Sequence, residues 1–284
     1  MRTDGNIRSS CIIGYPVEHS LSPKLHGFWI KKYGITAKYT ALSVAPHELE
    51  ITLKSLKKLG YVGCNVTLPY KEEVMNLMEE CSDLSRLVGS VNTVVVKEDG
   101  SLYGDNTDVY GFTENLCERV PDLKSNLRNV SVLGAGGAAR AVCVGLIQLG
   151  AKQILIFNRN RERSEELAKD FGPVIKPQPW DRRSEMLGGI SLLINATSLG
   201  MKNQPPLDID LSLLPNSAIV NDLVYSPLMT NLLIDAKVRG NTIVDGLGML
   251  LHQARSGFTA WFGVEVEVTY DLRKFILESL VVQS

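Results

Sequence analysis

A glycine-rich turn in the middle of the chain constrains the fold more than any other feature. The turn Gly134-Ala135-Gly136-Gly137-Ala138-Ala139 follows a strand-like run, 129–133, and opens an apolar helical stretch. Gly134 permits a tight turn, Gly136 lets backbone N–H groups approach a pyrophosphate, and the small Ala139 allows close packing of helix on strand. The spacing therefore predicts a βαβ unit that binds a dinucleotide at a helix N-terminus. A purely structural turn is the alternative.

Short β-rich runs alternate with helical periodicity along almost the whole chain. Beyond the turn, we predict strands at 153–157, 191–195, 218–222 and 242–245, separated by helical stretches. Before the turn, we predict strands at 11–14, 37–44 and 63–67, helices at 22–33, 46–59, 71–81 and 110–119, a turn-rich segment at 121–128, and a hairpin of 91–96 with 101–103. This alternation is typical of α/β proteins with parallel sheets and covering helices.

The length of 284 residues indicates two domains, because single hydrophobic cores stop growing near this size. We expect an N-terminal α/β substrate domain of residues 1–108 plus 247–284, and a Rossmann-type NADP-binding domain of residues 109–246. The chain is largely helical after Gly246. We expect these C-terminal helices to return to the first domain, with a cleft between the domains.

Composition favours a small-molecule partner. The formal charge of −1 provides no basic surface for nucleic acid, and no run reaches the roughly 20 apolar residues of a membrane span. The first ten residues do not resemble a secretion signal, so we expect a cytoplasmic protein. Five cysteines without CxxC spacing indicate buried thiols rather than disulfides or a metal site.

The end of the strand at 153–157 predicts which dinucleotide binds. An NAD enzyme usually presents an acid there to the ribose 2′-hydroxyl, but this chain has Asn158 and Arg159. Three arginines cluster at this point: Arg159, Arg161 and Arg163. Guanidinium groups suit the 2′-phosphate of NADP because they bind oxyanions through two hydrogen bonds. A solvated helix start is the alternative, since glutamates follow at 162, 165 and 166.

Polar clusters after the first-half strands predict a substrate site. Ser20 and Ser22 flank a bend and could bind a carboxylate, although helix capping alone would account for Ser22. We predict Lys71 at a helix start, where a cation is disfavoured and a lysine can exchange protons near neutrality. Asp108 supplies an acid that could pair with Lys71, and Asn92 an amide that could bind a hydroxyl. A surface charge is the alternative for Lys71.

Eight motifs follow one another along the chain: SLSP, NVTLPYK, VNT, GDNTD, GAGGAARA, NATSLGM, DLVYSP and DGLGMLLHQA. In this order they resemble the shikimate dehydrogenase family over nearly the whole chain. The resemblance implies a two-domain enzyme that uses NADPH to reduce 3-dehydroshikimate reversibly to shikimate, in the chorismate route to aromatic amino acids.

The resemblance also implies roles for individual residues. Ser20, Ser22 and Tyr225 would hold the substrate carboxylate, and Thr67, Asn92, Asp108 and Gln253 the ring hydroxyls. Lys71 would carry the proton, with Asp108 orienting it. The cofactor phosphates would lie against Gly134, Ala135, Gly136, Gly137, Ala138, Asn158, Arg159, Asn160, Arg161, Glu162 and Arg163, and the rest of the cofactor against Asp83, Leu223 and Gly246.

The sequence departs from the family at three positions. Gly27 replaces the usual asparagine, Val109 replaces a frequent glycine, and Asn160 replaces a threonine that commonly helps to bind the 2′-phosphate.

Two other functions remain open. A quinate/shikimate dehydrogenase tends to carry threonine at the second serine and an acid near the arginine cluster, so Ser22 and Arg159 speak against it. The presence of both Lys71 and Asp108 speaks against a non-catalytic shikimate-binding regulator. The chain could act as a monomer or a homodimer.

Overall fold

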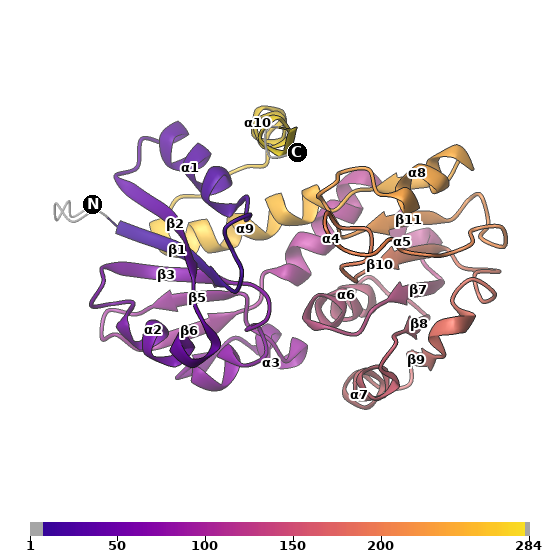
Figure 1. Cartoon of the computed structure of the whole chain (residues 1–284), viewed down its shortest axis with the longest axis horizontal. Coiled ribbons are helices and arrows are strands. Elements are labelled where there is room, and N and C mark those ends of the chain that lie inside the picture. The colour runs from indigo at the N-terminus through magenta and orange to yellow at the C-terminus, as the bar shows by residue number, and fades with distance from the viewer. Residues whose placement is uncertain (1–7, 282–284) are drawn as a thin grey trace. The chain divides into compact units, whose positions relative to one another are not determined.

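The computed structural model describes residues 8–281, which form two compact units (Figure 1). Unit 1 contains Met1–Thr107 and Gln253–Ser284, and unit 2 contains Asp108–His252. Residues 1–7 and 282–284, which our prediction gave to the first domain, lie outside the described residues. None of the described helices combines the length and the apolar character needed to cross a membrane.

Unit 1 is built on a six-stranded mixed sheet of order β2-β1-β3-β5-β6-β4. Its strands are β1 (Arg8–Gly14), β2 (Ala37–Ser43), β3 (Tyr61–Val66), β4 (Glu80–Cys81), β5 (Thr93–Val96) and β6 (Leu102–Asp105). β1 pairs in parallel with β2 and β3, whereas β5 is antiparallel to β3 and to β6. The predicted hairpin of β5 and β6 is confirmed, and Gly100 has a φ of +96° in its turn.

Helices cover this sheet, and two of them come from the C-terminal part of the chain. The helices are α1 (Ser22–Lys32), α2 (Leu49–Ser55), α3 (Asp83–Val88), α9 (Leu247–Phe262) and α10 (Tyr270–Val281), with 3₁₀ helices η1 (Pro46–Glu48) and η2 (Val74–Leu77). The boundary between the units falls within α9.

The C-terminal helices return to unit 1 through hydrogen bonds from two indoles. Trp261 Nε1 on α9 donates to the Val94 carbonyl of β5 at 2.9 Å, and Trp29 Nε1 donates to the Glu267 carbonyl at 3.2 Å. Gly63 makes room for the first indole, since a Cβ there would lie 2.2 Å from Trp261 Nε1. The predicted return of these helices is confirmed.

Unit 2 has a six-stranded, wholly parallel sheet of order β12-β11-β10-β7-β8-β9. Its strands are β7 (Asn129–Leu133), β8 (Gln153–Phe157), β9 (Ile175–Gln178), β10 (Leu192–Asn195), β11 (Ile219–Asp222) and β12 (Thr242–Val244). Its helices are α4 (Asp108–Arg119), α5 (Leu123–Asn126), α6 (Gly137–Gln148), α7 (Arg161–Phe171) and α8 (Asn231–Val238), with the 3₁₀ helix η3 (Trp180–Arg182).

Alternating side chains build a core on each face of the second sheet. Val132 and Ile154 lie in one core with residues of α4, α6 and α7. Leu133 and Leu155, one position further along each strand, lie in the other core with residues of α8. A parallel sheet buried on both faces, in this strand order, confirms the predicted Rossmann-type domain and the α/β class.

The helix predicted at 71–81 is wrong. This segment consists of turns, η2 and β4. The Lys71 carbonyl, which an α-helix would use for a bond four residues on, accepts the Val91 N–H at 2.8 Å instead. The Tyr70 hydroxyl is fixed as well, because it donates to the Val44 carbonyl at 2.5 Å. Long-range bonds therefore override the helical periodicity of the segment.

Other differences concern element lengths and short elements. The helix predicted at 46–59 divides into η1 and the shorter α2, and the turn-rich segment 121–128 contains the short helix α5. The strands β4 and β9 and the helix α3 were not predicted. These elements have six residues or fewer, which gives a periodic pattern too few positions to be recognised.

An imidazole lies in the aromatic core of unit 1. His26, on α1, is fully buried, and its ring stacks on Tyr39 with the centroids 4.1 Å apart and on Phe258 with the centroids 5.8 Å apart. Desolvation by burial lowers the pKa of His26 to about 3. The imidazole is therefore neutral in the folded protein between pH 5 and pH 7.

We predict that His26 makes folding stability depend on pH. Below its ordinary pKa of about 6.5 the unfolded chain takes up a proton that the folded chain does not, so stability is lost as pH falls. Between pH 7 and pH 5 this amounts to about 2 kcal/mol of unfolding free energy. Urea unfolding of His26→Phe should show a correspondingly smaller loss, whereas His47→Phe, at an exposed histidine, should behave like wild type. An unchanged pH dependence in His26→Phe would contradict the assignment.

Candidate active site

Two serines lie together at the start of α1. Ser22 is the first helical residue and is buried, and its backbone N–H donates to Ser20 Oγ at 3.2 Å. The N-cap is Leu21, which already has helical backbone angles and makes no side-chain cap. The capping role considered for Ser22 is therefore wrong, because Ser22 is itself the first helical residue and Leu21 is the N-cap.

Thr67 and Lys71 follow β3. The Thr67 N–H donates to the Ile13 carbonyl of β1 at 2.9 Å, and the Thr67 carbonyl accepts the Tyr70 N–H at 3.1 Å. Lys71 is partly buried at the turn that follows. Because no α-helix starts at Lys71, the argument from an unfavourable helix dipole does not apply to it.

A buried amide network brings together Asn92 and Gln253, which are 161 residues apart in the chain. Asn92 Oδ1 accepts the Thr107 N–H at 2.8 Å, and this bond fixes the orientation of the amide. Asn92 Nδ2 then donates to Gln253 Oε1 at 3.3 Å and to Thr107 Oγ1 at 3.1 Å. The two side chains are 2% and 9% exposed, so the bonds are shielded from water.

A further set of buried side chains supports Asn92 from behind. Asn65 Nδ2 donates to the Asn92 carbonyl and to Thr93 Oγ1, both at 3.2 Å, and Asn65 Oδ1 accepts the Tyr39 hydroxyl at 2.7 Å. Sequence reasoning gave no role to Asn65, Thr93 or Thr107. The signal was present, because each lies within a motif that already contained a candidate residue.

Asp108 follows this network directly in the chain. It is the first residue of α4, comes immediately after Thr107, and is only 4% exposed. Asp83, in contrast, is an exposed residue in the first turn of α3, and its carboxylate lies 3.6 Å from Arg86.

The glycine-rich turn lies where the strand order of the second sheet reverses. Gly134 has a φ of +108°, and a Cβ there would lie 3.0 Å from the Ala196 carbonyl oxygen beyond β10. Gly136 is the N-cap of α6 and has no side-chain cap, and a Cβ there would meet nothing within 4 Å. Open space beside Gly136 and a helix start without a side-chain cap suit a pyrophosphate.

The residues after β8 form a pocket of about 390 Å³ lined by Asn158, Arg159, Asn160 and Arg163. Asn160 caps α7 by accepting the Arg163 N–H at 3.4 Å. Within residues 8–281, neither Arg159 nor Arg163 has an acidic group within ion-pair distance.

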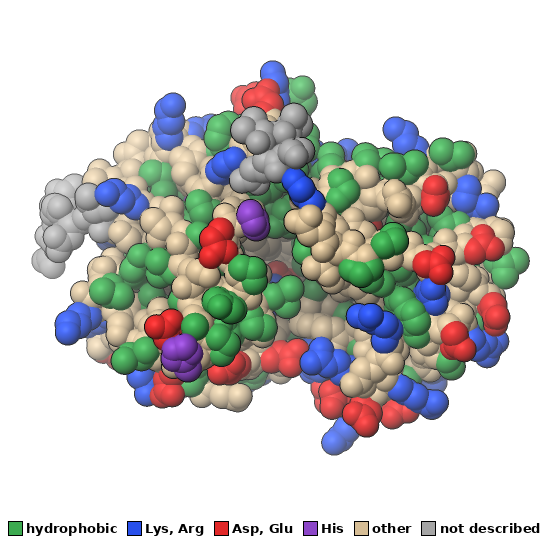
Figure 2. All heavy atoms as spheres, in the orientation of Figure 1, with side chains coloured by type: hydrophobic (Ala, Val, Ile, Leu, Met, Phe, Trp, Pro, Cys, Tyr) green, Lys and Arg blue, Asp and Glu red, His purple; other side chains and the backbone are tan. Residues whose placement is uncertain are grey.

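Arg161 and Glu162 are not part of the pocket lining. Arg161 Nε donates to Glu165 on the same helix at 2.7 Å. Basic and acidic side chains gather together over α7 in Figure 2. The three arginines that look alike in sequence therefore have different surroundings.

The end of β11 holds a buried carboxylate that sequence reasoning missed. Asp222 has no exposed surface and accepts hydrogen bonds from Asn195 Nδ2 at 2.9 Å, the Val224 N–H at 3.0 Å and Thr230 Oγ1 at 2.6 Å. Desolvation raises the pKa of Asp222 to about 6, and these three donors oppose that rise.

The segment after Asp222 carries two predicted site residues, Leu223 and Tyr225. Both are partly buried, and desolvation raises the pKa of the Tyr225 hydroxyl, which keeps it a neutral donor. Gly246 packs against this segment, since a Cβ there would lie 2.2 Å from the Leu223 carbonyl oxygen.

The residues of unit 2 fit an NADP molecule. The open helix start after Gly136 offers N–H donors to a pyrophosphate, and the pocket of Arg159 and Arg163 offers two cations to a further phosphate. An acid at this position would repel that phosphate, and none lines the pocket.

Comparisons with known proteins agree with this geometry. Residues 12–94 match the family "Shikimate dehydrogenase substrate binding domain", and residues 116–202 match "Shikimate / quinate 5-dehydrogenase". The chain is 50% identical over 273 residues to the shikimate dehydrogenase (NADP(+)) of Paramagnetospirillum magneticum, covering 96% of this chain and 99% of that protein.

Two solved structures show the same fold over nearly the full length. The shikimate 5-dehydrogenase of Thermus thermophilus, solved with NADP(H) and shikimate, has a TM-score of 0.82 at 32% identity, covering 97% of this chain and 99% of that one. The quinate dehydrogenase of Corynebacterium glutamicum, solved with NAD, has a TM-score of 0.87 at 27% identity, covering 98% and 99%. The chain belongs to the shikimate dehydrogenase family.

Proposed function

We propose that the protein is an NADP-dependent shikimate dehydrogenase, which reduces 3-dehydroshikimate reversibly to shikimate in the chorismate route to aromatic amino acids. The observation that carries the proposal is the buried network of Asn92, Thr107 and Gln253. It holds two amide side chains in fixed orientations within the unit that matches the family's substrate-binding domain. Fixed neutral donors and acceptors suit a small ring with several hydroxyls.

The substrate carboxylate is held by three hydroxyls, those of Ser20, Ser22 and Tyr225. The adjacent serines and the neutral phenol support this role, because hydroxyl donors bind a carboxylate without introducing a competing charge. The ring hydroxyls are bound by Thr67, Asn92, Asp108 and Gln253.

Lys71 supplies the proton. Bound NADPH supplies the hydride to the ketone carbon of the substrate. The resulting alkoxide oxygen takes a proton from Lys71 Nζ, and in the reverse direction Lys71 accepts it. Asp108 pairs with Lys71 and orients it. The burial of Asp108 supports this role, because a shielded carboxylate acts strongly on a nearby ammonium.

The NADP phosphates lie against two parts of unit 2. The pyrophosphate lies at the turn formed by Gly134, Ala135, Gly136, Gly137 and Ala138. The pocket of Asn158, Arg159, Asn160 and Arg163 would hold the 2′-phosphate, and Arg161 and Glu162 are next to these residues in the chain. Asp83, Leu223 and Gly246 lie beside the rest of the cofactor. Gly246 packs against the backbone of Leu223.

The partners are the small substrate and NADP, and the protein acts in the cytoplasm as a monomer or a homodimer. Five free cysteines support that location, because thiols persist in a reducing compartment. A quinate/shikimate dehydrogenase is the second candidate, favoured by the close fold similarity to the quinate dehydrogenase. The buried Ser22 and the position of Arg159 in the pocket after β8 favour the first candidate.

Assays of shikimate and quinate, each with NADP and with NAD, should give the fastest nicotinamide reduction for shikimate with NADP.

In Lys71→Ala we expect kcat to fall by about 10²- to 10⁴-fold, because the proton carrier is lost, while shikimate still binds. Lys54→Ala, which removes an exposed lysine paired with Glu50, is the matched control and should keep the wild-type rate. Equal rates for Lys71→Ala and wild type would remove the role proposed for Lys71.

Arg159→Ser should raise the KM for NADP by about 10- to 100-fold, because a charged hydrogen-bond donor to the 2′-phosphate is lost. The KM for NAD should stay nearly constant. Arg161→Ser is the control, since Arg161 is already paired with Glu165. A similar loss with both dinucleotides would show that Arg159 does not read the 2′-phosphate.

A further inference from the structure

The Asp222 carboxylate joins three segments of unit 2. Its donors come from the end of β10 (Asn195), from the segment after β11 (Val224) and from the N-cap of α8 (Thr230). All three donors are neutral, and among the described residues no lysine, arginine or histidine lies within ion-pair distance of Asp222. A fully buried carboxylate with this environment is costly to fold, so its position calls for an explanation beyond charge pairing.

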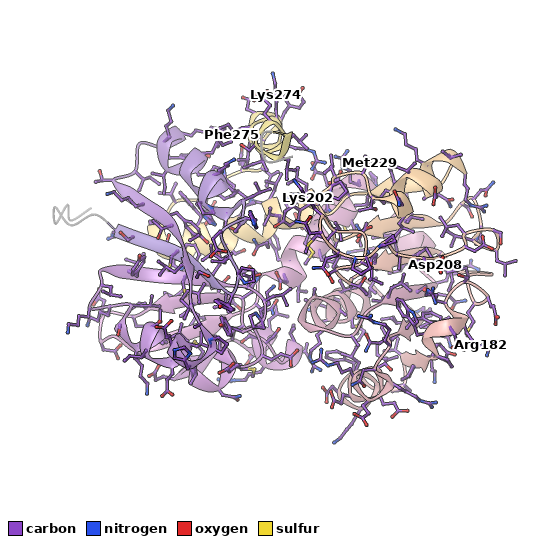
Figure 3. All side chains as sticks on the ribbon, viewed as in Figure 1. Arg182, Lys202, Asp208, Met229, Lys274 and Phe275 are labelled. Atoms are coloured by element: carbon purple, nitrogen blue, oxygen red, sulfur yellow. The ribbon has the colours of Figure 1, made fainter. Side chains whose placement is uncertain are left out.

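The segment that Asp222 holds is fixed from other sides as well. The Gly246 backbone approaches Leu223 so closely that no side chain fits between them. The Lys202 N–H, in the loop after β10, donates to the Ser226 carbonyl at 2.8 Å. In Figure 3, Lys202 marks the loop after β10 and Met229 marks the segment before α8. The Leu223 N–H also donates to the Asn195 carbonyl at 3.0 Å, so Leu223–Ser226 is located by bonds at both of its ends.

We propose that Asp222 is a positioning residue for shikimate binding, because it fixes the backbone of Val224 and with it the place of the Tyr225 hydroxyl. This inference rests on the proposed function, in which Tyr225 binds the substrate carboxylate. Asp222 itself contacts neither substrate nor cofactor in this role. It acts on the KM for shikimate through Tyr225.

Two neighbouring parts do not depend on the Asp222 side chain for their position. Leu223, proposed to lie beside the cofactor, donates its N–H to the Asn195 carbonyl at 3.0 Å. Asn195 Oδ1 accepts the Thr197 N–H at 3.1 Å and the Thr197 hydroxyl at 2.7 Å, and neither bond involves Asp222. The loop after β10 therefore keeps its own anchor when Asp222 is replaced. In the segment of Tyr225, the bonds of Leu223 and Ser226 remain, but the Val224 N–H between them loses its acceptor, because it has none other than Asp222 among the described contacts.

Two substitutions separate folding from positioning. Asp222→Ala removes all three acceptor bonds and leaves a cavity. Asp222→Asn keeps the volume and one oxygen, so it can still accept from Asn195 and Val224, while its amide meets Thr230 Oγ1, which already accepts the Leu233 N–H at 3.4 Å. Asp222→Asn therefore tests the inference even if Asp222→Ala does not fold.

The experiment measures shikimate oxidation near pH 8 in a double-mutant cycle of Asp222 and Tyr225. We expect Asp222→Ala to raise the KM for shikimate by about tenfold or more and Asp222→Asn by about threefold, with kcat and the KM for NADP within about twofold of wild type. In the Tyr225→Phe background, either substitution should change the shikimate KM by less than about twofold, because the hydroxyl that they position is absent.

Asn241→Ala is the matched control. Asn241 is also buried in unit 2 and also makes three hydrogen bonds, to the carbonyls of Pro215, Asn216 and Ala218, but these lie before β11 rather than after it. It should lower stability with an unchanged shikimate KM.

The outcomes separate this inference from the proposed function. A wild-type KM in Tyr225→Phe would overturn the role of Tyr225 and the inference with it. The inference alone would be overturned if Tyr225→Phe raises the shikimate KM but the Asp222 substitutions do not. It would also be overturned if the Asp222 substitutions raise the KM by the same factor with Tyr225 and with Phe at position 225.

Discussion

Buried polar side chains at the ends of strands need hydrogen-bond partners, and the candidate site residues of each unit depend on how this need is met. In unit 1, the Asn92 amide obtains partners from Thr107 and from Gln253, far away in the chain. In unit 2, Asp222 obtains donors from three segments. Each network joins segments that are separate in the chain, and its hydrogen bonds fix the orientation of the side chains that it contains.

The fold could be predicted where local sequence decides the structure. The strand at 129–133 and the turn at Gly134 were recognised because a positive φ and close packing require particular residues at fixed spacing. The segment 71–81 could not be predicted, because the bond between Val91 and Lys71 joins residues that only the folded sheet brings together. Helical periodicity is a local signal and loses to such a tertiary bond.

The site shows the same division between local and long-range information. Motifs identified Asn92 and Gln253, but not that the two amides bond to each other. Arg159 and Arg161 look equivalent in sequence. They differ in the structure because only Arg161 has Glu165 one helical turn later on its own face. Asp222 was missed because an acid at the end of a strand carries no signal of burial by itself.

The return of α9 to unit 1 has a consequence for synthesis on the ribosome. Unit 2 is continuous in sequence and can complete its sheet once residue 252 has emerged. The aromatic surface around His26 and Tyr39 remains incomplete until Phe258 and Trp261, which pack against it, have been synthesised. Unit 1, whose first residues are synthesised before those of unit 2, therefore completes its folding after unit 2. Until then the nascent chain exposes an apolar surface of the kind that chaperones recognise.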